Sequence, residues 1–264
     1  MLKTAFFGAA GKMGRMLIAK AQDDPEIQTV AALESTESPA LGRDAGEVAG
    51  IGTIGVEVTS TLPSDVTPDV LIDFSNARAF EQVLALCVER KIPLVYATTG
   101  LNAEQIAQLE EAAKTNLILR SPSMSPAVNL TMKLAQIAAR ALKDSDVDVE
   151  IIERHHRFKV DAPSGTALKF GELIAREMGI DRSCFGREGK VGARPHNEIG
   201  YHAVRVGDDP GRHTILFGAI GESLELTVKS TNRESYATGA FAAAKFLTRQ
   251  KPGRVYDMFD ALDL

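Results

Sequence analysis

The middle of the chain holds five basic side chains within six positions, followed by a proline and a glycine. The segment, residues 153–167, reads ERHHRFKVDAPSGTA, in a chain whose net charge is −5. Histidine titrates near neutral pH and lysine carries a compact positive charge, so the combination suits proton transfer and the binding of a small anion. The five residues are Arg154, His155, His156, Arg157 and Lys159.

The residues that follow predict a second anion-binding element. Pro163 ends the extended run, and Ser164 is a favourable N-cap for a helix. The free backbone amides of Gly165 and Thr166 lie at the positive end of the helix dipole and form an amide cradle that attracts a carboxylate. The basic residues and the helix start together predict a substrate with two carboxylates.

We expect the strand that begins at Val147 to continue through residues 153–159. In that case His155, Arg157 and Lys159 project from one side of the strand and His156 from the other. Two alternatives stay open from the residues alone: adjacent histidines can bind a metal, and a basic strand can simply be solvated. No Cys or HxxxH pair completes a ligand set, so we expect no metal.

A glycine-rich turn near the N-terminus has the spacing of a dinucleotide-binding site. Residues 8–14 read GAAGKMG, which fits GxxGxxG, and they lie between a predicted strand at 2–7 and a predicted helix. Such glycines let the backbone approach a pyrophosphate at the helix N-terminus. A strand-to-helix turn that binds no ligand can also be rich in glycine. The position of this turn, directly after a predicted strand and at the start of a predicted helix, favours cofactor binding.

Glu34 ends the next predicted strand, 20 positions after Gly14. A carboxylate there accepts hydrogen bonds from the adenosine ribose and repels a 2′-phosphate. Because Ser35 rather than arginine follows, we expect NADH to be preferred, with Lys12 or Arg43 allowing some use of NADPH. The alternative is a solvated strand end.

The glycine turn belongs to an alternation of short apolar runs and helical stretches. We expect strands at 2–7, 28–33, 70–74, 93–96 and 117–119, with helices at 78–90 and 103–114. Residues 35–69 are rich in Gly, Ser, Thr and Pro and predict a loop with one further strand. This alternation is typical of a doubly wound, mostly parallel sheet.

The pattern changes after SPSMSP at 121–126. A helix is predicted over 128–142, with Leu130, Leu134, Ile137, Ala138 and Ala141 on one face. The strand from Val147 and further strands near 199–206, 214–219 and 224–230 predict an open mixed or antiparallel sheet backed by helices. A final helix at 235–247 is expected to pack on the first domain.

These elements predict an α/β chain of two domains. The first is a Rossmann-type, doubly wound parallel sheet over 1–126, completed by 235–264. The second, over 127–234, is an α+β domain with an open mixed sheet that binds substrate and forms the oligomer.

The composition is that of an ordinary globular protein. The 264 residues are 44% hydrophobic and 25% charged, and the net negative charge disfavours a nucleic-acid partner. No segment reaches the ~18 consecutive apolar residues of a membrane helix. Cys87 and Cys184 form no CxxC pair. We therefore expect a cytoplasmic protein without a membrane partner.

The segment 153–167, the glycine turn and the TTG at 98–100 together resemble the dihydrodipicolinate reductase family. The REG at 187–189 and the DMFDALDL at 257–264 extend the resemblance to nearly the whole chain. The resemblance implies NAD(P)H-dependent reduction of 4-hydroxy-tetrahydrodipicolinate, a cyclic dicarboxylate, to tetrahydrodipicolinate in lysine and diaminopimelate biosynthesis. It also implies a homotetramer.

The resemblance further implies roles for individual residues. His155 and Lys159 match the catalytic pair, with Lys159 the more direct proton donor. His156, Gly165 and Thr166 match substrate contacts. The matches to the cofactor contacts are Gly8, Ala9, Ala10, Gly11, Lys12, Met13, Glu34, Ala97, Thr98, Thr99, Ser121, Pro122, Ser123 and Met124.

Three features depart from the family's usual pattern. Glycine is usual where Ala97 stands, and asparagine followed by phenylalanine is usual where Ser123 and Met124 stand. The arginine that can follow Glu34 is missing, which weakens NADPH binding. The contacts to the nicotinamide are therefore expected to differ in detail.

Two other functions fit parts of the sequence. An acylating semialdehyde dehydrogenase needs a cysteine nucleophile, but Cys87 lies in a predicted helix and Cys184 in a predicted loop. The Tyr-x-x-x-Lys pair of short-chain dehydrogenases is absent. A non-catalytic NAD-binding sensor would need the glycine turn but would have no use for His155 and Lys159 beside Thr166.

Overall fold

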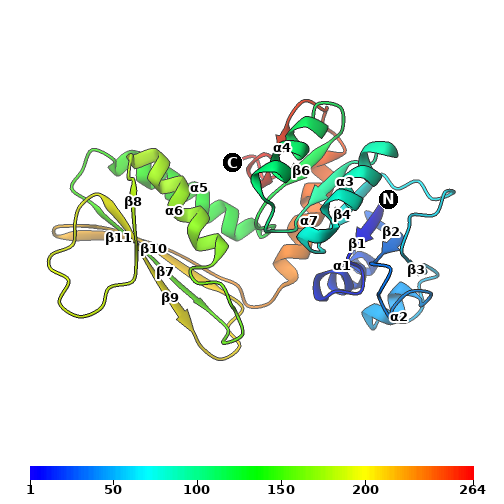
Figure 1. Cartoon of the computed structure of the whole chain (residues 1–264), viewed down its shortest axis with the longest axis horizontal. Helices are drawn as coiled ribbons and strands as arrows, with labels where there is room; N and C mark the ends of the chain where they lie inside the picture. The colour runs from blue at the N-terminus through cyan, green and yellow to red at the C-terminus, as the bar shows by residue number, and fades with distance from the viewer. The chain divides into compact units, whose positions relative to one another are not determined.

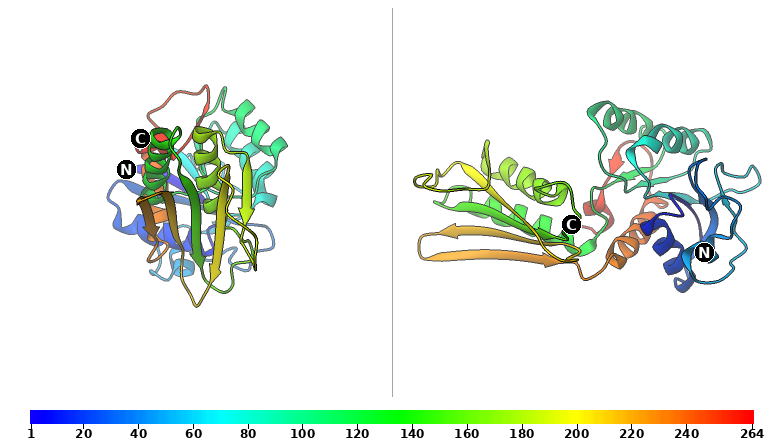
Figure 2. Two further views of the ribbon diagram at one scale, coloured as in Figure 1. Left: turned by 90° about the vertical axis from the view of Figure 1, so that its left-hand side faces the viewer. Right: turned by 60° about the horizontal axis from the view of Figure 1, so that its bottom comes forward.

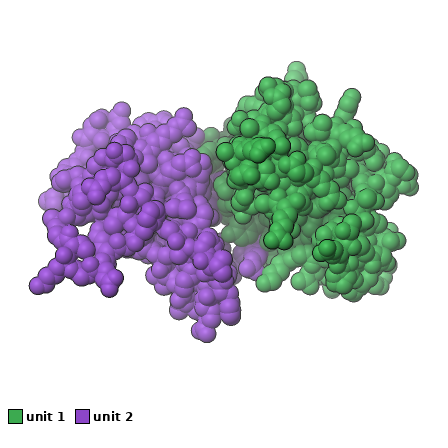
Figure 3. Space-filling view, viewed as in Figure 1, with its two compact units in different colours: residues 1–126, 234–264 green, residues 127–233 purple.

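The computed structural model describes residues 1–264. The chain forms two compact units, of which the first combines Met1–Pro126 with Glu234–Leu264 and the second is Ala127–Arg233 (Figure 3). None of the helices has the combination of length and apolar character that crossing a bilayer requires.

The first unit is built on a parallel sheet of seven strands in the order β12-β6-β5-β4-β1-β2-β3 (Figure 1). The order reverses between β1 and β4, which is the switch point of a doubly wound fold. This arrangement confirms the predicted Rossmann-type sheet. The strands are β1 (Leu2–Phe7), β2 (Ile27–Leu33), β3 (Val58–Thr59), β4 (Val70–Asp73), β5 (Leu94–Tyr96), β6 (Ile118–Arg120) and β12 (Val255–Tyr256).

Helices cover both faces of this sheet because alternate strand residues point to opposite sides. Phe6 packs in one core with the apolar residues of α1 and α7. Its neighbour Phe7 packs in the other core, with α3 and α4. The helices are α1 (Lys12–Asp23), α2 (Ala45–Ala49), α3 (Phe80–Glu89), α4 (Ala103–Ala112), α7 (Glu234–Leu247) and α8 (Met258–Ala261), with a 3₁₀ turn η1 (Ala77–Ala79) before α3.

The second unit has a mixed sheet of five strands in the order β11-β10-β7-β9-β8. β10 pairs antiparallel with β7 and β11, whereas β7 and β8 pair parallel with β9. Its helices, α5 (Pro126–Leu142) and α6 (Gly165–Met178), lie on one side of the sheet (Figure 2), which confirms the predicted open mixed sheet. The strands are β7 (Asp148–His155), β8 (Arg182–Phe185), β9 (Glu198–Arg205), β10 (Arg212–Ala219) and β11 (Glu222–Lys229).

The apolar face predicted for α5 is not the face that the structure buries. Leu130, Leu134 and Ile137 are 45%, 42% and 54% exposed. The buried face instead includes Val128, Met132, Ala135 and Ala139, which also repeat with helical spacing. The helix has two apolar stripes, and the stripe with the smaller side chains is the buried one. Periodicity identifies both stripes but does not choose between them.

Three local predictions also need correction. β7 ends at His155, so the strand does not continue to residue 159. The region 35–69 contains the short helix α2 as well as β3, because the Asp44 carboxylate accepts hydrogen bonds from the amides of Gly46 (2.8 Å) and Glu47 (3.2 Å) at its start. Cys184 lies in β8 rather than in a loop.

Candidate functional site

The basic segment of the second unit starts at the end of β7 and continues as a tight turn. His155 is the last residue of the strand and is buried. The amide of Lys159 donates to the His156 carbonyl at 3.1 Å, and the amide of Arg157 donates to the Gly207 carbonyl at 3.0 Å. His155, Arg157 and Lys159 therefore do not share one side of a strand, because the backbone turns between them.

Lys159 lies next to a carboxylate of its own segment. Its Nζ is 2.7 Å from Oδ1 of Asp161. Partial burial disfavours ionisation of Asp161, but the Lys159 ammonium and the nearby backbone amides outweigh burial and lower the Asp161 pKa. The Asp161 carboxylate thus pairs with the predicted catalytic lysine, and the Gly165 amide at the start of α6 favours its ionised form.

The start of α6 has the features expected of a carboxylate-binding helix N-terminus. Ser164 is the N-cap, and its Oγ accepts from the amide of Ala167 at 3.2 Å. No acidic side chain stands in the first turn. Gly165 is exposed, and no atom lies within 4 Å of the position a Cβ would take there. The amides of Gly165 and Thr166 are therefore accessible at the positive end of the helix.

His155 is surrounded by charged and titratable groups of the same unit. Its Nδ1 lies 2.6 Å from Oε2 of Glu153, and its ring meets the edge of the His213 ring at 5.2 Å between centroids. Burial lowers the pKa of His155, Glu153 opposes this effect, and Lys159 and Arg205 add to it. His213 is more deeply buried, and burial together with the neighbouring His155 lowers its pKa to about 4.

His156 differs from its neighbour. Its Nδ1 is buried and has no hydrogen-bond partner, and its ring lies 6.2 Å from the ring of Phe158. Phe158 and Val160 are 78% and 98% exposed, so this turn presents apolar side chains outward around the basic ones.

The glycine turn of the first unit has the close backbone approach that its spacing predicts. Gly8 has φ +79°, and a Cβ there would lie 2.9 Å from the Phe74 carbonyl oxygen. A Cβ on Gly14 would lie 2.1 Å from the Gly8 carbonyl oxygen. Both positions therefore require glycine. α1 begins at Lys12 without a side-chain cap or an acidic residue in its first turn, which leaves its N-terminal amides available for a phosphate.

Glu34 lies directly after β2 and reaches back to this turn. Its Oε2 accepts a hydrogen bond from the amide of Ala10 at 2.9 Å, and its Oε1 accepts from the amide of Ser35 at 3.0 Å. The two elements predicted to bind opposite ends of an adenosine diphosphate group are thus in contact.

The loop after β5 is held by a buried aspartate that the sequence interpretation did not single out. Thr98 Oγ1 donates to Asp73 Oδ2 at 2.6 Å, and the Ala97 amide donates to the Asp73 carbonyl at 3.0 Å. Burial raises the pKa of Asp73 to about 6, although hydrogen bonds from Ser75 and Thr98 oppose the shift. Thr99 is exposed. The sequence signal for this residue was an aspartate, Asp73, at the end of the otherwise apolar strand VLID.

The segment after β6 is mostly buried. Ser121 Oγ donates to the Ser123 carbonyl at 2.8 Å, whereas Pro122 is exposed. Met124 is 1% exposed and belongs to the core that α7 covers. A Cβ on Gly239 would lie 1.6 Å from the Met124 carbonyl oxygen, so α7 packs directly on this segment. The Met124 side chain therefore serves the core, and only its backbone is left for a ligand contact.

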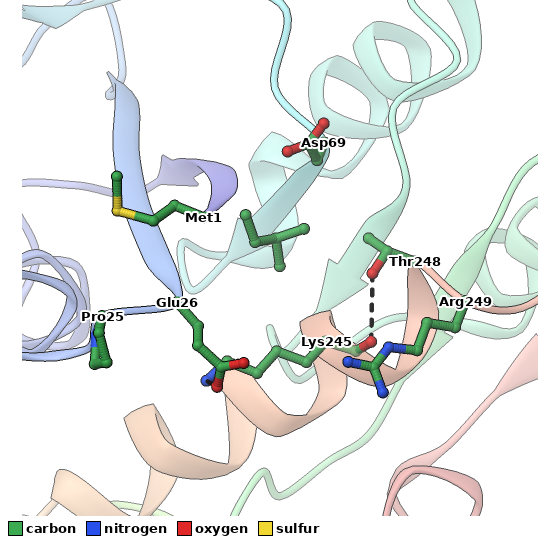
Figure 4. Close-up of a pocket in the computed structure, with 8 residues that line it drawn as sticks. Met1, Pro25, Glu26, Asp69, Lys245, Thr248 and Arg249 are labelled. Atoms are coloured by element: carbon green, nitrogen blue, oxygen red, sulfur yellow. Dashed lines mark hydrogen bonds and ion pairs between the residues drawn. The ribbon is translucent and has the colours of Figure 1, made fainter.

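The first unit also has a depression of about 320 Å³ that contains none of the predicted site residues (Figure 4). Leu2, Glu26 and Asp69 lie at the amino ends of parallel strands, opposite to the glycine turn. Glu26 is paired there with Lys245 at 2.7 Å. Because none of the predicted site residues lines this depression, we assign it no role. The lining residues are Met1, Leu2, Pro25, Glu26, Asp69, Lys245, Thr248 and Arg249.

The acylating-dehydrogenase alternative loses support from the placement of the two cysteines. Cys87 is fully buried in α3, and burial raises the pKa of its thiol, which does not suit a nucleophile. Cys184 is on β8 in the second unit. No group of three or more His, Cys, Asp or Glu side chains is placed to hold a metal ion.

The first unit's parallel sheet, its glycine turn after β1 and its carboxylate after β2 define a dinucleotide-binding domain of the Rossmann type. Family models described as "Dihydrodipicolinate reductase, N-terminus" and "Dihydrodipicolinate reductase, C-terminus" match residues 2–124 and 127–262. The chain therefore belongs to the dihydrodipicolinate reductase family, which confirms the resemblance.

Relatives cover the whole chain. The 4-hydroxy-tetrahydrodipicolinate reductase of Rhodopirellula baltica is 52% identical over 97% of this chain and 94% of its own length. The protein of that name from Alkalilimnicola ehrlichii is 46% identical over 99% of each chain. The solved structure of dipicolinate-bound dihydrodipicolinate reductase from Paenisporosarcina sp. TG-14 is 27% identical, covers 98% of both chains and has a TM-score of 0.78.

Proposed function

We propose that the protein catalyses the NAD(P)H-dependent reduction of 4-hydroxy-tetrahydrodipicolinate to tetrahydrodipicolinate, in lysine and diaminopimelate biosynthesis. The observation that carries the assignment to particular residues is the placement of Asp161. Its carboxylate lies 2.7 Å from Lys159 Nζ, and the nearby Gly165 amide favours its ionised form, so this part of the second unit stabilises a negative charge. A substrate carboxylate would be held by the same lysine and by the amides of Gly165 and Thr166, with His156 beside them.

The cofactor is proposed to bind the first unit, with NADH preferred over NADPH. The close approach at Gly8 and Gly14 and the uncapped start of α1 fit a pyrophosphate. Glu34 fits the ribose hydroxyls and disfavours a 2′-phosphate. The loops at 97–99 and 121–124 are the proposed nicotinamide contacts. The bound dinucleotide supplies the hydride that reduces the substrate ring.

The chain's own residues would handle charge and the proton. Reduction moves negative charge toward the imine nitrogen and the carboxylates of the substrate. Lys159 and the α6 amides, which are already oriented, stabilise this charge more in the transition state than in the ground state. Lys159 is the proposed proton donor, and His155 is the proposed group that donates or accepts the proton through it.

The remaining assignments concern assembly and location. We propose that the second unit binds substrate and forms a homotetramer, a number that follows from the family resemblance. The uncovered side of its sheet, where Ile152 and Val204 are 40% and 43% exposed, is the proposed contact. A cytoplasmic location agrees with the two free cysteines.

The assay mixes the protein with NADH and the product of dihydrodipicolinate synthase and follows the loss of NADH absorbance. Substrate-dependent oxidation is expected. Binding of NADH without oxidation would contradict the proposal and favour the sensor.

Titration of both cofactors tests the NADH preference. We expect the double variant Glu34→Ser/Ser35→Arg to move the ratio of kcat/KM values toward NADPH by about 10-fold or more, because it replaces a repelling charge with an attracting one. An unchanged ratio would show that Glu34 does not contact the ribose.

A further inference from the structure

We propose that Glu153 is a positioning residue that fixes the tautomer and orientation of His155 and, through Ser164, the start of α6. This inference rests on the proposed function, because it explains how the second unit holds His155 and the amide cradle in fixed positions relative to each other. Glu153 lies on β7 two residues before His155, so both side chains point to the same buried side of the sheet.

Every contact of the Glu153 carboxylate is with a hydrogen-bond donor or a group that can become one. Oε2 lies 2.6 Å from His155 Nδ1 and accepts from Arg205 Nη1 at 2.9 Å. Oε1 accepts from the amide of Ser164 at 3.0 Å and from Arg205 Nη2 at 2.7 Å. Burial disfavours ionisation, but Arg205 and His155, together with the Ser164 amide, outweigh it and lower the Glu153 pKa.

An ionised carboxylate can only accept hydrogen bonds, so Nδ1 of His155 must carry a hydrogen. The proton that His155 exchanges is then the one on Nε2. Gly211 lies next to that nitrogen: it has φ +143°, and a Cβ there would lie 3.0 Å from Nε2, so a side chain at this position would crowd the ring. A carboxylate that orients a histidine ring in this way also stabilises its protonated form.

The same carboxylate is connected to the helix that presents the amide cradle. It binds the backbone amide of Ser164, the N-cap of α6. The Ser164 hydroxyl in turn lies 3.0 Å from Nε2 of His213, whose ring contacts His155. Movement of Glu153 would therefore displace both His155 and the start of the helix.

Two substitutions separate positioning from simple structural support because they should shift the pKa of His155 in opposite directions. The groups that face His155 are Glu153 on β7, Arg205 on β9, His213 on β10 and Lys159 in the turn. Removing the Glu153 charge destabilises the imidazolium, so Glu153→Gln should lower the His155 pKa. Removing the Arg205 charge stabilises the imidazolium, so Arg205→Gln should raise it.

The experiment measures pH profiles of kcat and KM, with circular dichroism to check folding. Glu153→Gln should reduce kcat by about 10- to 100-fold with a smaller change in KM, and the two variants should move the kinetic pKa of the histidine in opposite directions, by about one pH unit each. Glu198→Gln, which alters another buried carboxylate paired with an arginine, is the control and should leave the profile unchanged. Shifts of the same sign, or none, would overturn the proposal.

Nitrogen-15 NMR of wild-type histidines tests the tautomer without depending on turnover or on any Glu153 variant. The His155 signal, assigned by its loss in His155→Gln, should show a protonated Nδ1 and an unprotonated Nε2 above its titration. The opposite tautomer would overturn the proposal even in an active enzyme. Failure of the wild type to oxidise NADH would instead overturn the proposed function.

Discussion

Lys159 forms an ion pair with Asp161, and the same ammonium group is proposed to bind the substrate. We expect Lys159→Ala to lower kcat by on the order of 10²-fold and to raise KM less, because the interaction strengthens as charge develops in the transition state. Steady-state kinetics on the purified variant measure both constants. Lys169→Ala, which removes a lysine paired with Glu172 on α6, is the control and should leave kcat unchanged. Equal kcat values for wild type and Lys159→Ala would remove Lys159 from the chemistry.

Asp161 competes with the substrate for Lys159 if the proposed site is right. Its side chain is 51% exposed, so the pair is worth little in free energy, and we expect Asp161→Asn to lower KM by about two- to five-fold with kcat unchanged. KM for the dicarboxylate, measured at several salt concentrations, checks this expectation, and the gain should shrink as salt screens the charges. A higher KM would mean that Asp161 holds Lys159 in place for the substrate.

At the scale of elements, Asp73 joins the ends of β4 and β5. Its pKa rises from 3.8 to about 6 on burial, so the folded state holds its proton more tightly than the unfolded state between these values. Stability from this group is present below pH 3.8 and is lost as pH rises through 6. Asp73→Asn cannot ionise at this position, so it does not lose this stability. Between pH 4 and pH 7 its free energy of unfolding should therefore rise by on the order of 3 kcal/mol relative to that of wild type.

Urea unfolding at several pH values measures this difference, since groups common to both proteins cancel. Exposed Asp65→Asn is the matched control and should follow the wild type. Parallel stability curves for wild type and Asp73→Asn would show that the buried carboxylate does not titrate in this range.

Local patterns predicted the elements well where a single physical reason dominates. The strand at 2–7, the glycine turn and the N-cap at Ser164 depend on residues within a few positions of one another. Which face of α5 is buried and where β7 ends depend on contacts with segments distant in the sequence. At the end of β7, for example, the His155 carbonyl accepts a hydrogen bond from the Val206 amide at 3.0 Å. Glu153 belongs to the sequence motif, but its partner Arg205 lies 52 residues later. The pairing of the two side chains is therefore set by the fold and could not be predicted from the motif.

At the scale of the whole molecule, one side of the second unit's sheet is uncovered in a single chain. Along β7, Val149 and Ile151 are buried whereas Ile152 is 40% exposed, and Val204 on β9 is 43% exposed. A sheet normally buries an apolar face against another layer, and symmetric copies of the chain can supply that layer. Part of the same side is polar, because Glu150 binds Arg187 at 2.8 Å and Arg194 at 2.8 Å.

Placing a charge at the centre of this side should therefore separate the copies. If the proposed tetramer forms through this side, Ile152→Asp should reduce the mass measured by size exclusion with light scattering below that of wild type, because an aspartate buried without a partner in an interface costs several kcal/mol. Val88→Asp on α3 changes a side chain of similar exposure, 41%, in the first unit and should leave the mass unchanged. An Ile152→Asp protein that keeps the wild-type mass would show that the subunits associate through another surface.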